Sequence, residues 1–577
     1  MPRDHTITRE GGDRRTFRPR PRAGSLRPAP TDKITQEFPP VNPADAPTSG
    51  DPMTNDPAPT TDHGPDAWRT RLGLKLDSGA VAEFRAALDH AGFSGEGVAD
   101  AIGRDAFSGA SGRRRDELLL RTCAGRPVDT LIRFFLIGSP VTPEALDGAM
   151  PSFGADRLLK SGLATQTSDA LRSRFELLPV DRLLVFFDRR EDEQGREGFA
   201  DDYVMGVGAS TRTLIASRIG RKSKTAMDLG TGCGVIALTM AQDAETVVAS
   251  DINPRAAAMT SLNATLNNIT NIEPVLGSYF EPVRGRPLGS VVTNPPFVIS
   301  PERRYIYRDS GLPADHAVRA VCRDGAQALE EGGCMQILCN WASTRDHPFD
   351  ERVCSWFGGT GCDAVVLVST ESTPRAYACT WISHTETDTP DEASERLDRW
   401  LAYYDSHEIT AMVGGLISVR KRSVGPPNFA DVYRVPERVL TRGRLGDCIL
   451  RMLESGAALA GVATDEALGA LRPAAAPDAR VRQEFGPEGE GWSLLSTEIS
   501  ADGSPLPPRP TDAYMSRMLM RCDGKRPLGE LVGDLASQLA EDLGSDPDQA
   551  RAGALRLARR MIAEGVLLPG GSGVQKQ

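Results

Sequence analysis

Apolar residues change their spacing along the chain, and the spacing predicts four regions. In residues 66–190 they recur at helical intervals, as in Ala80–Leu88, and residues 426–577 show the same pattern. In residues 191–425 short apolar runs alternate with helical patterns, which predicts a mostly parallel sheet with right-handed crossovers. Residues 1–65 have almost no large apolar side chains and are predicted to form a disordered tail.

Seven strands are predicted in the central region. They span residues 225–229, 246–250, 272–276, 289–293, 334–340, 363–369 and 411–420. Residues 371–410 are predicted to be an insertion that contains an amphipathic helix from Glu392 to Tyr404. In the N-terminal region a strand is predicted at Leu183–Phe187 after several short helices, and both flanking regions resemble winged-helix domains. Residues 470–510, rich in Ala, Pro and Gly, are predicted to be loop.

A stiff polar turn follows the fourth predicted strand. It consists of Asn294, Pro295, Pro296 and Phe297. In an open α/β sheet the carboxyl ends of the strands are where ligands bind, and the prolines leave carbonyl groups able to accept because they fix φ and remove two donors. The Asn294 oxygen and the adjacent carbonyl can accept both hydrogens of one –NH2 group, while the Phe297 ring can stack on a planar group. The turn therefore predicts a site for a planar amine or amide nitrogen.

A glycine-rich turn follows the first predicted strand, and an acidic residue ends the second. The turn contains Asp228, Gly230, Thr231, Gly232 and Gly234. Its glycines let a ligand approach the backbone, and Asp251, about 20 residues further on, suits a ribose diol. Val235 stands where a nicotinamide-binding motif has its third glycine, and the Asp228 carboxylate would repel a pyrophosphate but suits an ammonium group. A nicotinamide-dependent oxidoreductase is therefore disfavoured.

These motifs, in this order, resemble the class I S-adenosylmethionine-dependent methyltransferases, and within them the HemK/PrmC and adenine-N6 type with an (N/D)-P-P-(F/Y) motif. The matching segments are Asp228–Gly234, Asp251–Pro254 and Asn294–Phe297, and the resemblance covers about residues 200–425. It implies a Rossmann-like α/β fold with a mostly parallel seven-stranded sheet, flanked by the two mainly helical domains. HemK-like proteins carry a Pro-Arg-Pro-Glu-Thr-Glu motif before the glycine turn, and this chain does not.

The resemblance also implies S-adenosylmethionine as cofactor and a role for each motif. The implied cofactor site comprises Asp228, Gly230, Thr231, Gly232, Gly234, Asp251, Ile252 and Asn294. Asp251 would hold the ribose, Asp228 and the glycine loop the methionine part, and Tyr203–Thr211 would lie over the methionine end. The implied catalytic residues are Asn294, Pro295, Pro296 and Phe297. Ser278 stands where many relatives carry an acid that binds the adenine amine, so adenine recognition falls to the backbone or to neighbours such as Tyr279.

The methyl acceptor stays open between a protein glutamine and a nucleobase. Basic and aromatic residues in Arg303–Asp309 suit a nucleic acid or an acidic peptide, or form a surface loop over the cleft. Asp315 and His316 are candidates to relay a proton. A different hypothesis is a winged-helix nucleic-acid- or peptide-binding regulator that only senses S-adenosylmethionine. The intact turn at Asn294 argues against it, because a sensor has no use for that turn.

Composition and charge narrow the class of protein. The chain has 577 residues, of which 40% are hydrophobic and 25% charged, as in ordinary soluble multidomain proteins. Its net charge of −11 disfavours a protein that mainly coats nucleic acid. Ten cysteines without a C-x-x-C pair predict neither a metal site nor disulfides, and they favour the cytoplasm. No apolar run approaches the roughly 18 residues that span a membrane, and Met53 offers an alternative start that would remove residues 1–52.

Overall fold

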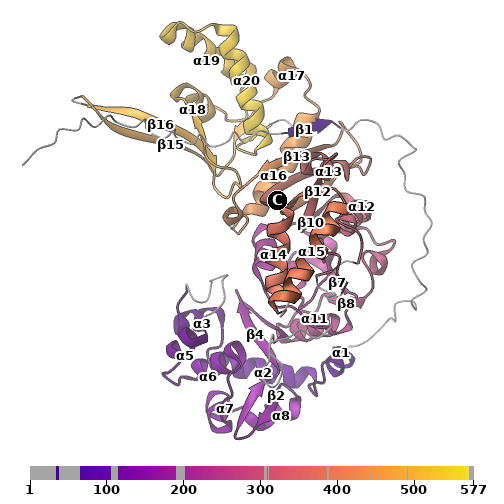
Figure 1. Ribbon diagram of the computed structural model, residues 1–577. Coiled ribbons are helices and arrows are strands. Elements are labelled where there is room, and N and C mark those ends of the chain that lie inside the picture. Colours follow the sequence, from indigo (N-terminus) through magenta and orange to yellow (C-terminus); the bar gives the residue numbers. More distant parts are fainter. Residues whose placement is uncertain are drawn as a thin grey trace, which may run out of the picture. The chain divides into compact units, whose positions relative to one another are not determined.

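The computed structural model describes residues 34–37, 65–104, 115–189, 202–303, 308–309, 311–385, 389–441, 443–489 and 491–570. The chain divides into two units, of which the second is compact and spans residues 33–577. All described residues lie in the second unit, whose helices and strands are labelled in Figure 1.

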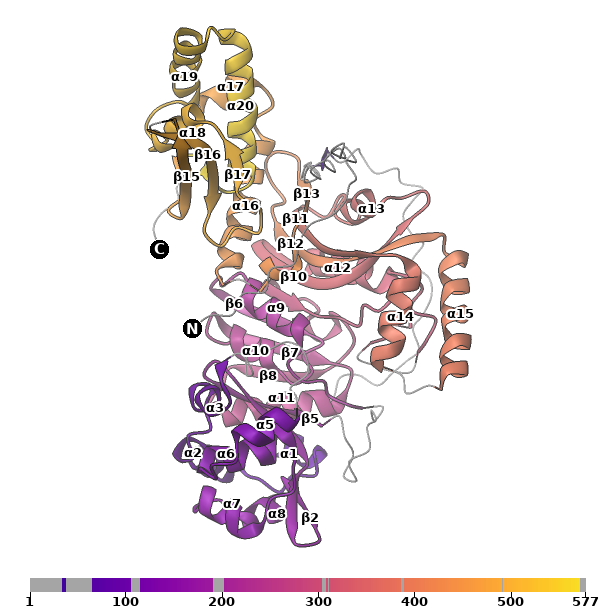
Figure 2. The same ribbon diagram turned by 60° about the vertical axis from the view of Figure 1, so that its left-hand side comes forward.

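A nine-stranded sheet forms the centre of this unit (Figures 1 and 2). In spatial order its strands are β1 (Ile34–Glu37), β13 (Phe429–Arg434), β11 (Cys362–Ser372), β12 (Ile409–Lys421), β10 (Leu329–Thr344), β9 (Leu288–Thr293), β6 (Ser223–Leu229), β7 (Ala244–Asp251) and β8 (Ile272–Leu276). Neighbouring strands run parallel except at β12, which is antiparallel to β10 and β11, and at β1. The seven predicted strands are all present, and the mostly parallel Rossmann-like α/β fold is confirmed.

Two strands of this sheet were not among the seven predicted. β13 lies within the helical region predicted at residues 426–577, and it pairs in parallel with β11. The region predicted at residues 426–577 therefore begins with a strand of the central sheet, and only the residues after β13 lie outside that sheet. β1 lies within the predicted tail and pairs with β13, so the prediction of a disordered segment is wrong for residues 34–37. The other residues from 1 to 64 lie outside the described residues.

Helices cover both faces of the sheet, which explains why the central strand β9 is buried along its whole length. One face carries α9 (Ala209–Ser217), α10 (Val235–Met240) and α11 (Pro254–Leu266), and the other carries α12 (His316–Ala328) and α13 (Phe349–Ser355). Successive residues of a strand point to opposite faces. Ala226 accordingly belongs to the core on the α11 side, and Met227 belongs to the core on the α12 side.

The N-terminal part combines short helices with two β-hairpins. Its elements are α1 (Pro65–Arg71), α2 (Ser78–His90), α3 (Gly95–Ile102), α5 (Arg115–Arg121), α6 (Pro127–Leu131), the π-helical η2 (Ile132–Ile137), α7 (Pro143–Ala149), α8 (Ala155–Ser161), β2 (Ala164–Thr167), β3 (Ala170–Ser173), β4 (Phe175–Val180) and β5 (Leu183–Asp188). The predicted strand at Leu183–Phe187 is confirmed as β5, which pairs with β4 outside the large sheet. The winged-helix assignment stays a prediction.

Two helices, α14 (Pro374–Thr385) and α15 (Pro390–Ser406), form the predicted insertion between β11 and β12. The helix predicted at residues 392–404 is confirmed as α15. Its first turn is capped by Thr389, which exchanges hydrogen bonds with Glu392. Trp400 and Tyr404 are buried on its inner side, so the insertion packs on the sheet domain rather than extending into solvent.

The C-terminal part contains more strand than predicted. Its elements are the 3-10 turn η4 (Glu437–Val439), α16 (Leu445–Ala460), α17 (Asp465–Ala470), β14 (Ala474–Ala475), β15 (Ala479–Glu488), β16 (Gly491–Ala501), β17 (Arg509–Thr511), α18 (Ala513–Met520), α19 (Leu528–Leu543), α20 (Pro547–Ala563) and β18 (Leu567–Leu568). The loop predicted at residues 470–510 is wrong, because β15 and β16 form a long hairpin there.

All ten cysteines are free thiols. Among the described residues, no helix has the length and apolar character required to cross a bilayer. In the same part of the chain, His, Cys, Asp and Glu side chains nowhere gather in a group of three that could hold a metal ion.

The hairpin β4–β5 is joined to α11 by asparagine side chains. Asn263 is fully buried; its Nδ2 donates to the carbonyls of Phe186 and Cys233, and its Oδ1 accepts from Phe186 N, each at 2.8 Å. Asn267 makes similar bonds to both backbone groups of Leu184. Because Cys233 lies in the glycine loop, Asn263 ties the N-terminal part directly to the candidate site.

Replacing Asn263 by alanine tests this joint, because the exchange leaves three buried backbone groups without their partners. We expect the free energy of unfolding of Asn263→Ala to fall by about 2–4 kcal/mol, as measured by chemical denaturation. A Thr270→Ala exchange at an exposed position near the end of the same helix is the control, with an expected change within about 0.5 kcal/mol. Equal stability of wild type and Asn263→Ala would contradict the role of this side chain.

Candidate functional site

The glycine loop after β6 presents bare backbone to open space. Gly230 and Gly232 have φ angles of +72° and +55°, and a Cβ added at either residue would meet no atom within 4 Å. A Cβ on Gly234 would lie only 2.7 Å from Thr260 Oγ1, so the third glycine serves the packing of the loop on α11. The first two glycines therefore form a surface on which a ligand can lie directly against the backbone.

Asp228, the last-but-one residue of β6, accepts hydrogen bonds from this loop and from the helix α10 that follows it. It is completely buried, and its Oδ2 accepts from Thr231 Oγ1 at 2.8 Å and from Ala237 N at 2.9 Å. Its Oδ1 has no hydrogen-bond partner among the described residues. Burial raises the pKa of Asp228 to about 7. Only Oδ1 of Asp228 is therefore left to make the predicted contact with a cofactor, because Oδ2 already accepts two hydrogen bonds.

Asp251 ends β7 beside the glycine loop. Its Oδ2 accepts from Gly232 N at 3.0 Å and its Oδ1 accepts from Asn253 N at 2.9 Å. Burial raises the pKa of this carboxyl, although backbone donors oppose the shift. The next side chain, Ile252, is 57% exposed. A carboxylate with remaining lone pairs next to an exposed apolar side chain can receive a sugar diol and the face of an attached planar base.

The Asn294 turn lies at the same edge of the sheet, since β9 is the other neighbour of β6. Thr293 Oγ1 donates to Leu229 O at 2.8 Å, which ties the start of the turn to the end of β6. The Asn294 Nδ2 donates to Ser210 Oγ at 3.3 Å, so the predicted segment Tyr203–Thr211 does meet the turn. Asn294 Oδ1 is buried without a partner among the described residues. Because buried acceptors are nearly always paired, this oxygen indicates a missing donor.

The sequence motifs did not identify the aromatic residues that hold this turn. Tyr377 of α14 accepts from Ile299 N at 3.2 Å and from Asn340 Nδ2 at 2.9 Å. Tyr404 of α15 donates to Ile299 O at 2.9 Å. Both backbone groups of Ile299, two residues beyond Phe297, are therefore fixed by the insertion.

The ring of Phe297 itself meets the insertion. Its centroid lies 6.2 Å from that of Trp381, and the two rings are nearly perpendicular at 75°. Such an edge-to-face contact leaves the orientation of Phe297 defined. The only sequence signal for this wall is the pair of aromatic residues one helical turn apart, Tyr377 and Trp381, in a segment whose fold position the sequence does not reveal.

Two further predictions need correction. Arg308, part of the basic and aromatic cluster 303–309, is buried and forms an ion pair with Asp309 at 2.7 Å, so it does not face a substrate from the surface. Residues 304–307 of that cluster lie outside the described residues.

Asp315 is buried and binds Arg352 through both carboxylate oxygens, at 2.6 and 2.8 Å. A carboxylate fixed in this way holds α12 against α13 and is not a proton relay, while His316 is the exposed first residue of α12.

The parallel strands thus bring together three of the predicted motifs at one edge of the sheet. The backbone N–H groups of Gly230 and Thr231 both donate to Ser250 O at 2.9 Å, so the first two loops are bonded to one another. The structure brings the predicted residues Asp228 to Gly234, Asp251, Ile252 and Asn294 to Phe297 to adjoining strand ends. This edge of the sheet therefore has the acceptors and the open backbone to receive a ligand made of an amino acid, a ribose and a base beside the Asn294 turn.

Comparisons with known proteins cover this same region. Residues 206–349 match the family model described as methyltransferase small domain, and residues 90–174 match a domain of unknown function, DUF7059. The release factor glutamine methyltransferase of Vibrio cholerae is 40% identical over 143 residues, which is 22% of this chain and 46% of the relative. The ribosomal protein uL3 glutamine methyltransferase of Xanthomonas campestris is 26% identical over 200 residues, 29% of this chain and 63% of the relative. The chain therefore spans about half to two-thirds of these curated relatives.

Among solved structures, the YcgJ protein of Bacillus subtilis covers 37% of this chain with 98% of its own, at 14% identity and a TM-score of 0.26. An rRNA methylase of Streptococcus thermophilus covers 37% of this chain with 94% of its own, at 14% identity and a TM-score of 0.22. Because these TM-scores are low, we assign the fold from the strand order of the sheet and not from the similarity to these structures.

The burial of Asp228 predicts a specific pH dependence of stability. Its pKa rises from 3.8 to about 7 on folding, so between these values the folded chain keeps a proton that the unfolded chain has lost. The free energy of unfolding therefore falls as the pH rises through this window, by on the order of a few kcal/mol. Asp228→Asn removes this titration and keeps an acceptor for Thr231 and Ala237. Denaturation at pH 5 and pH 8 should show the variant gaining stability relative to wild type; parallel pH profiles would contradict the assignment.

Proposed function

We propose, from the premise that the central domain is a class I methyltransferase domain of the HemK/PrmC type, that this protein transfers a methyl group from S-adenosylmethionine to the side-chain amide nitrogen of a glutamine in a protein. The observation that carries the proposal is the buried, unpaired Oδ1 of Asn294 at the carboxyl end of β9. A primary amide brings the N–H donor that this oxygen lacks.

The residues at the strand ends fit the cofactor. Asp251 would accept the ribose hydroxyls, and Ile252 would cover one face of the adenine. The open backbone at Gly230 and Gly232 would lie along the methionine part, where a Cβ would meet no protein atom and would instead fill the ligand's space. Asp228 Oδ1 would receive a donor, directly or through water. When bound, S-adenosylmethionine supplies a methyl group that is already activated for attack by a neutral nucleophile.

The turn at Asn294 then has the task of orientation. Asn294 Oδ1 and the carbonyl of Pro295 would each accept one hydrogen of the glutamine –NH2 group, which turns the nitrogen lone pair toward the methyl donor. Phe297, held against Trp381, would cover the plane of the amide. Orientation of two reactants contributes several kcal/mol to a barrier. As the new N–C bond formed and the sulfur left with the electron pair of the C–S bond, the glutamine nitrogen would become cationic and would release its proton to water. The chain would then need no strong base, in keeping with the ion-paired state of Asp315.

Protein glutamine is favoured over a nucleobase for two reasons. The relatives described above are glutamine methyltransferases by name. In the described part of the cluster next to the turn, Arg303 is exposed but Arg308 is buried with Asp309, so one arginine is left to meet phosphates, and the chain carries a net charge of −11. The regulator alternative gains no support from these relatives. Ten free thiols support a reaction in the reducing cytoplasm.

Exchange of Asn294 separates binding from transfer. We expect Asn294→Ala to lower methyl transfer by about 100-fold or more, because the acceptor nitrogen loses its orientation, and to leave the affinity for S-adenosylmethionine nearly unchanged. Transfer is measured as labelled methyl groups incorporated into a cell extract from which the native protein has been removed, and affinity by calorimetry. The label should be released by protease and not by nuclease.

Asp251→Ala is the matched control at the same edge of the sheet. It should weaken S-adenosylmethionine binding by about 10- to 100-fold because a hydrogen bond to a charged group is lost. Nuclease-sensitive label would overturn the glutamine acceptor, and label that is independent of Asn294 would overturn the site itself.

A further inference from the structure

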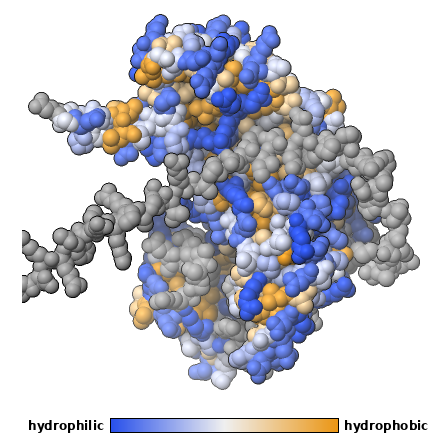
Figure 3. Space-filling view, turned by 45° about the horizontal axis from the view of Figure 1, so that its top comes forward, coloured by the Kyte–Doolittle hydropathy of each residue, from blue (hydrophilic) through white to orange (hydrophobic). Residues whose placement is uncertain are grey.

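The hairpin β15–β16 extends beyond the rest of the C-terminal part (Figures 1 and 3). The two strands pair from Ala479 and Ala501 at the base to Glu488 and Gly491 at the tip. The third strand, β17, pairs with β16 only at residues 497–499. The distal segment of each strand is therefore a two-stranded ribbon, about 17 Å long for residues 484–488.

The distal ribbon has one apolar face. Phe485 lies opposite Leu494, and Pro487 lies opposite Trp492, so the four side chains share a face because each strand alternates with a period of two. Trp492 is 74% exposed and Phe485 is 53% exposed. Figure 3 shows apolar side chains gathered on this arm. Leu495, at the bulge between the strands, is also 63% exposed.

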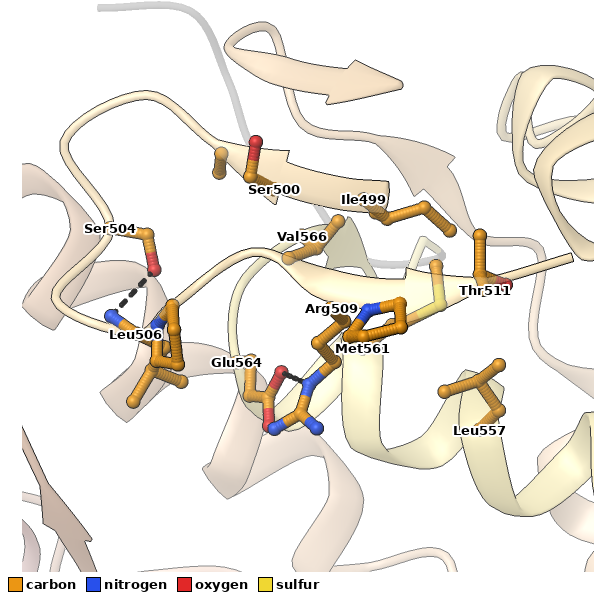
Figure 4. A pocket seen from close by; sticks show the side chains of 13 residues that line it. Ile499, Ser500, Ser504, Leu506, Arg509, Thr511, Leu557, Met561, Glu564 and Val566 are labelled. Carbon is orange, nitrogen blue, oxygen red and sulfur yellow. Dashed lines mark hydrogen bonds and ion pairs between the residues drawn. The ribbon is translucent and has the colours of Figure 1, made fainter. Parts of the chain in front are cut away.

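At the base of the hairpin the same face packs against the core of the C-terminal part, whereas at the tip its side chains are exposed. Ile499, at the base, is 3% exposed and belongs to the core of the C-terminal part. Figure 4 shows it above Leu557 and Met561 of α20, beside the ion pair of Arg509 with Glu564. The pocket there has a volume of about 10 Å³, enough for about one water. The base is therefore a closed core, and the exposed aromatic side chains at the tip contribute nothing to it.

Charge on the hairpin restricts what can cover this face. Residues 483–498 contain four glutamates and no lysine or arginine, and Glu484 and Glu488 are exposed on the face of the ribbon opposite to that of Phe485 and Trp492. Carboxylates on the back of this narrow ribbon give the arm a negative field that repels phosphates, which disfavours nucleic acid and an anionic bilayer. A second copy of this chain, at a net charge of −11, is disfavoured for the same reason. A basic protein surface with an apolar pocket is complementary in both respects.

We propose that the apolar face of the β15–β16 hairpin, formed by Phe485, Pro487, Trp492 and Leu494, is a docking surface for the methyl-accepting protein, and that the docked region of that protein is basic. The inference rests on the proposed function, because it names the acceptor as the occupant. Aromatic side chains, Trp and Phe among them, are enriched at the cores of protein interfaces. A second contact far from the reacting amide raises the local concentration of the acceptor at the Asn294 turn.

The test compares four full-length variants for label transfer into the depleted extract described above. Phe485→Thr with Trp492→Thr removes the anchors and keeps strand-forming residues, and Glu484→Lys with Glu488→Lys reverses the charge. Leu543→Gln, at a side chain of the same C-terminal part that is 65% exposed, is the matched control, and Asn294→Ala sets the background. Calorimetry with S-adenosylmethionine and thermal unfolding verify that each variant is folded.

We expect the anchor variant to lower the rate at limiting extract by about tenfold or more, as loss of anchor residues does, with the rate restored at high extract concentration. The charge variant should lose rate and lose the salt dependence of the wild type. Leu543→Gln should match wild type. If the anchor variant is unfolded, the charge variant decides, since its two positions are exposed.

Equal rates for wild type, anchor and charge variants would overturn the docking surface while leaving the proposed function intact. Absence of any label that depends on Asn294 would overturn both. Co-flotation of the wild type, but not the anchor variant, with phosphatidylglycerol vesicles would assign the face to a membrane. Self-association that is lost in the anchor variant, measured by sedimentation, would assign it to a second copy. Either result would also overturn the proposal.

Discussion

Parallel pairing of β7, β6 and β9 brings the carboxyl ends of three strands to one edge of the sheet, and the candidate site depends on this alignment. Hydrogen bonds at the edge itself fix the three loops relative to each other: Gly230 and Thr231 donate to Ser250 O, and Thr293 donates to Leu229 O. The glycine loop, the Asp251 carboxylate and the Asn294 turn are therefore positioned by backbone pairing. Side chains on the loops are left to meet ligands.

Polar groups buried at this edge impose a cost that a ligand can relieve. Asp228 Oδ1 and Asn294 Oδ1 both lack partners among the described residues, and an unsatisfied buried acceptor costs about 1–3 kcal/mol. The surrounding structure tolerates this because rigid elements hold each residue. Asp228 is fixed by Thr231 and Ala237, and the turn is fixed through Tyr377 and Tyr404 of the insertion. The two unpaired oxygens lower the free energy of unfolding of the empty protein. This is consistent with a site in which the cofactor and the methyl acceptor supply the missing hydrogen-bond donors.

The sequence was sufficient to predict those elements whose structure is determined by a local pattern. Seven strands, the glycine turn and the helix at residues 392–404 follow from spacing and capping. It was insufficient where distant partners decide. Nothing near Arg308 in sequence shows that its guanidinium lies over the ring of Trp400 of the insertion. The bonds of Tyr377 to Ile299 and Asn340 likewise join segments far apart in the chain. The β15–β16 hairpin was missed because Ala, Pro and Gly nearby concealed its period-two alternation.

The chemical identity of the product tests the central claim most directly. Protein labelled by the wild type with methyl-labelled S-adenosylmethionine, and not labelled by Asn294→Ala, is hydrolysed in strong acid. N-methylation of a glutamine side chain predicts labelled methylamine, because acid cleaves the substituted amide and leaves glutamate. Label retained on a free amino acid, or released as methanol, would place the methyl group on a different atom and contradict the role assigned to the Asn294 turn.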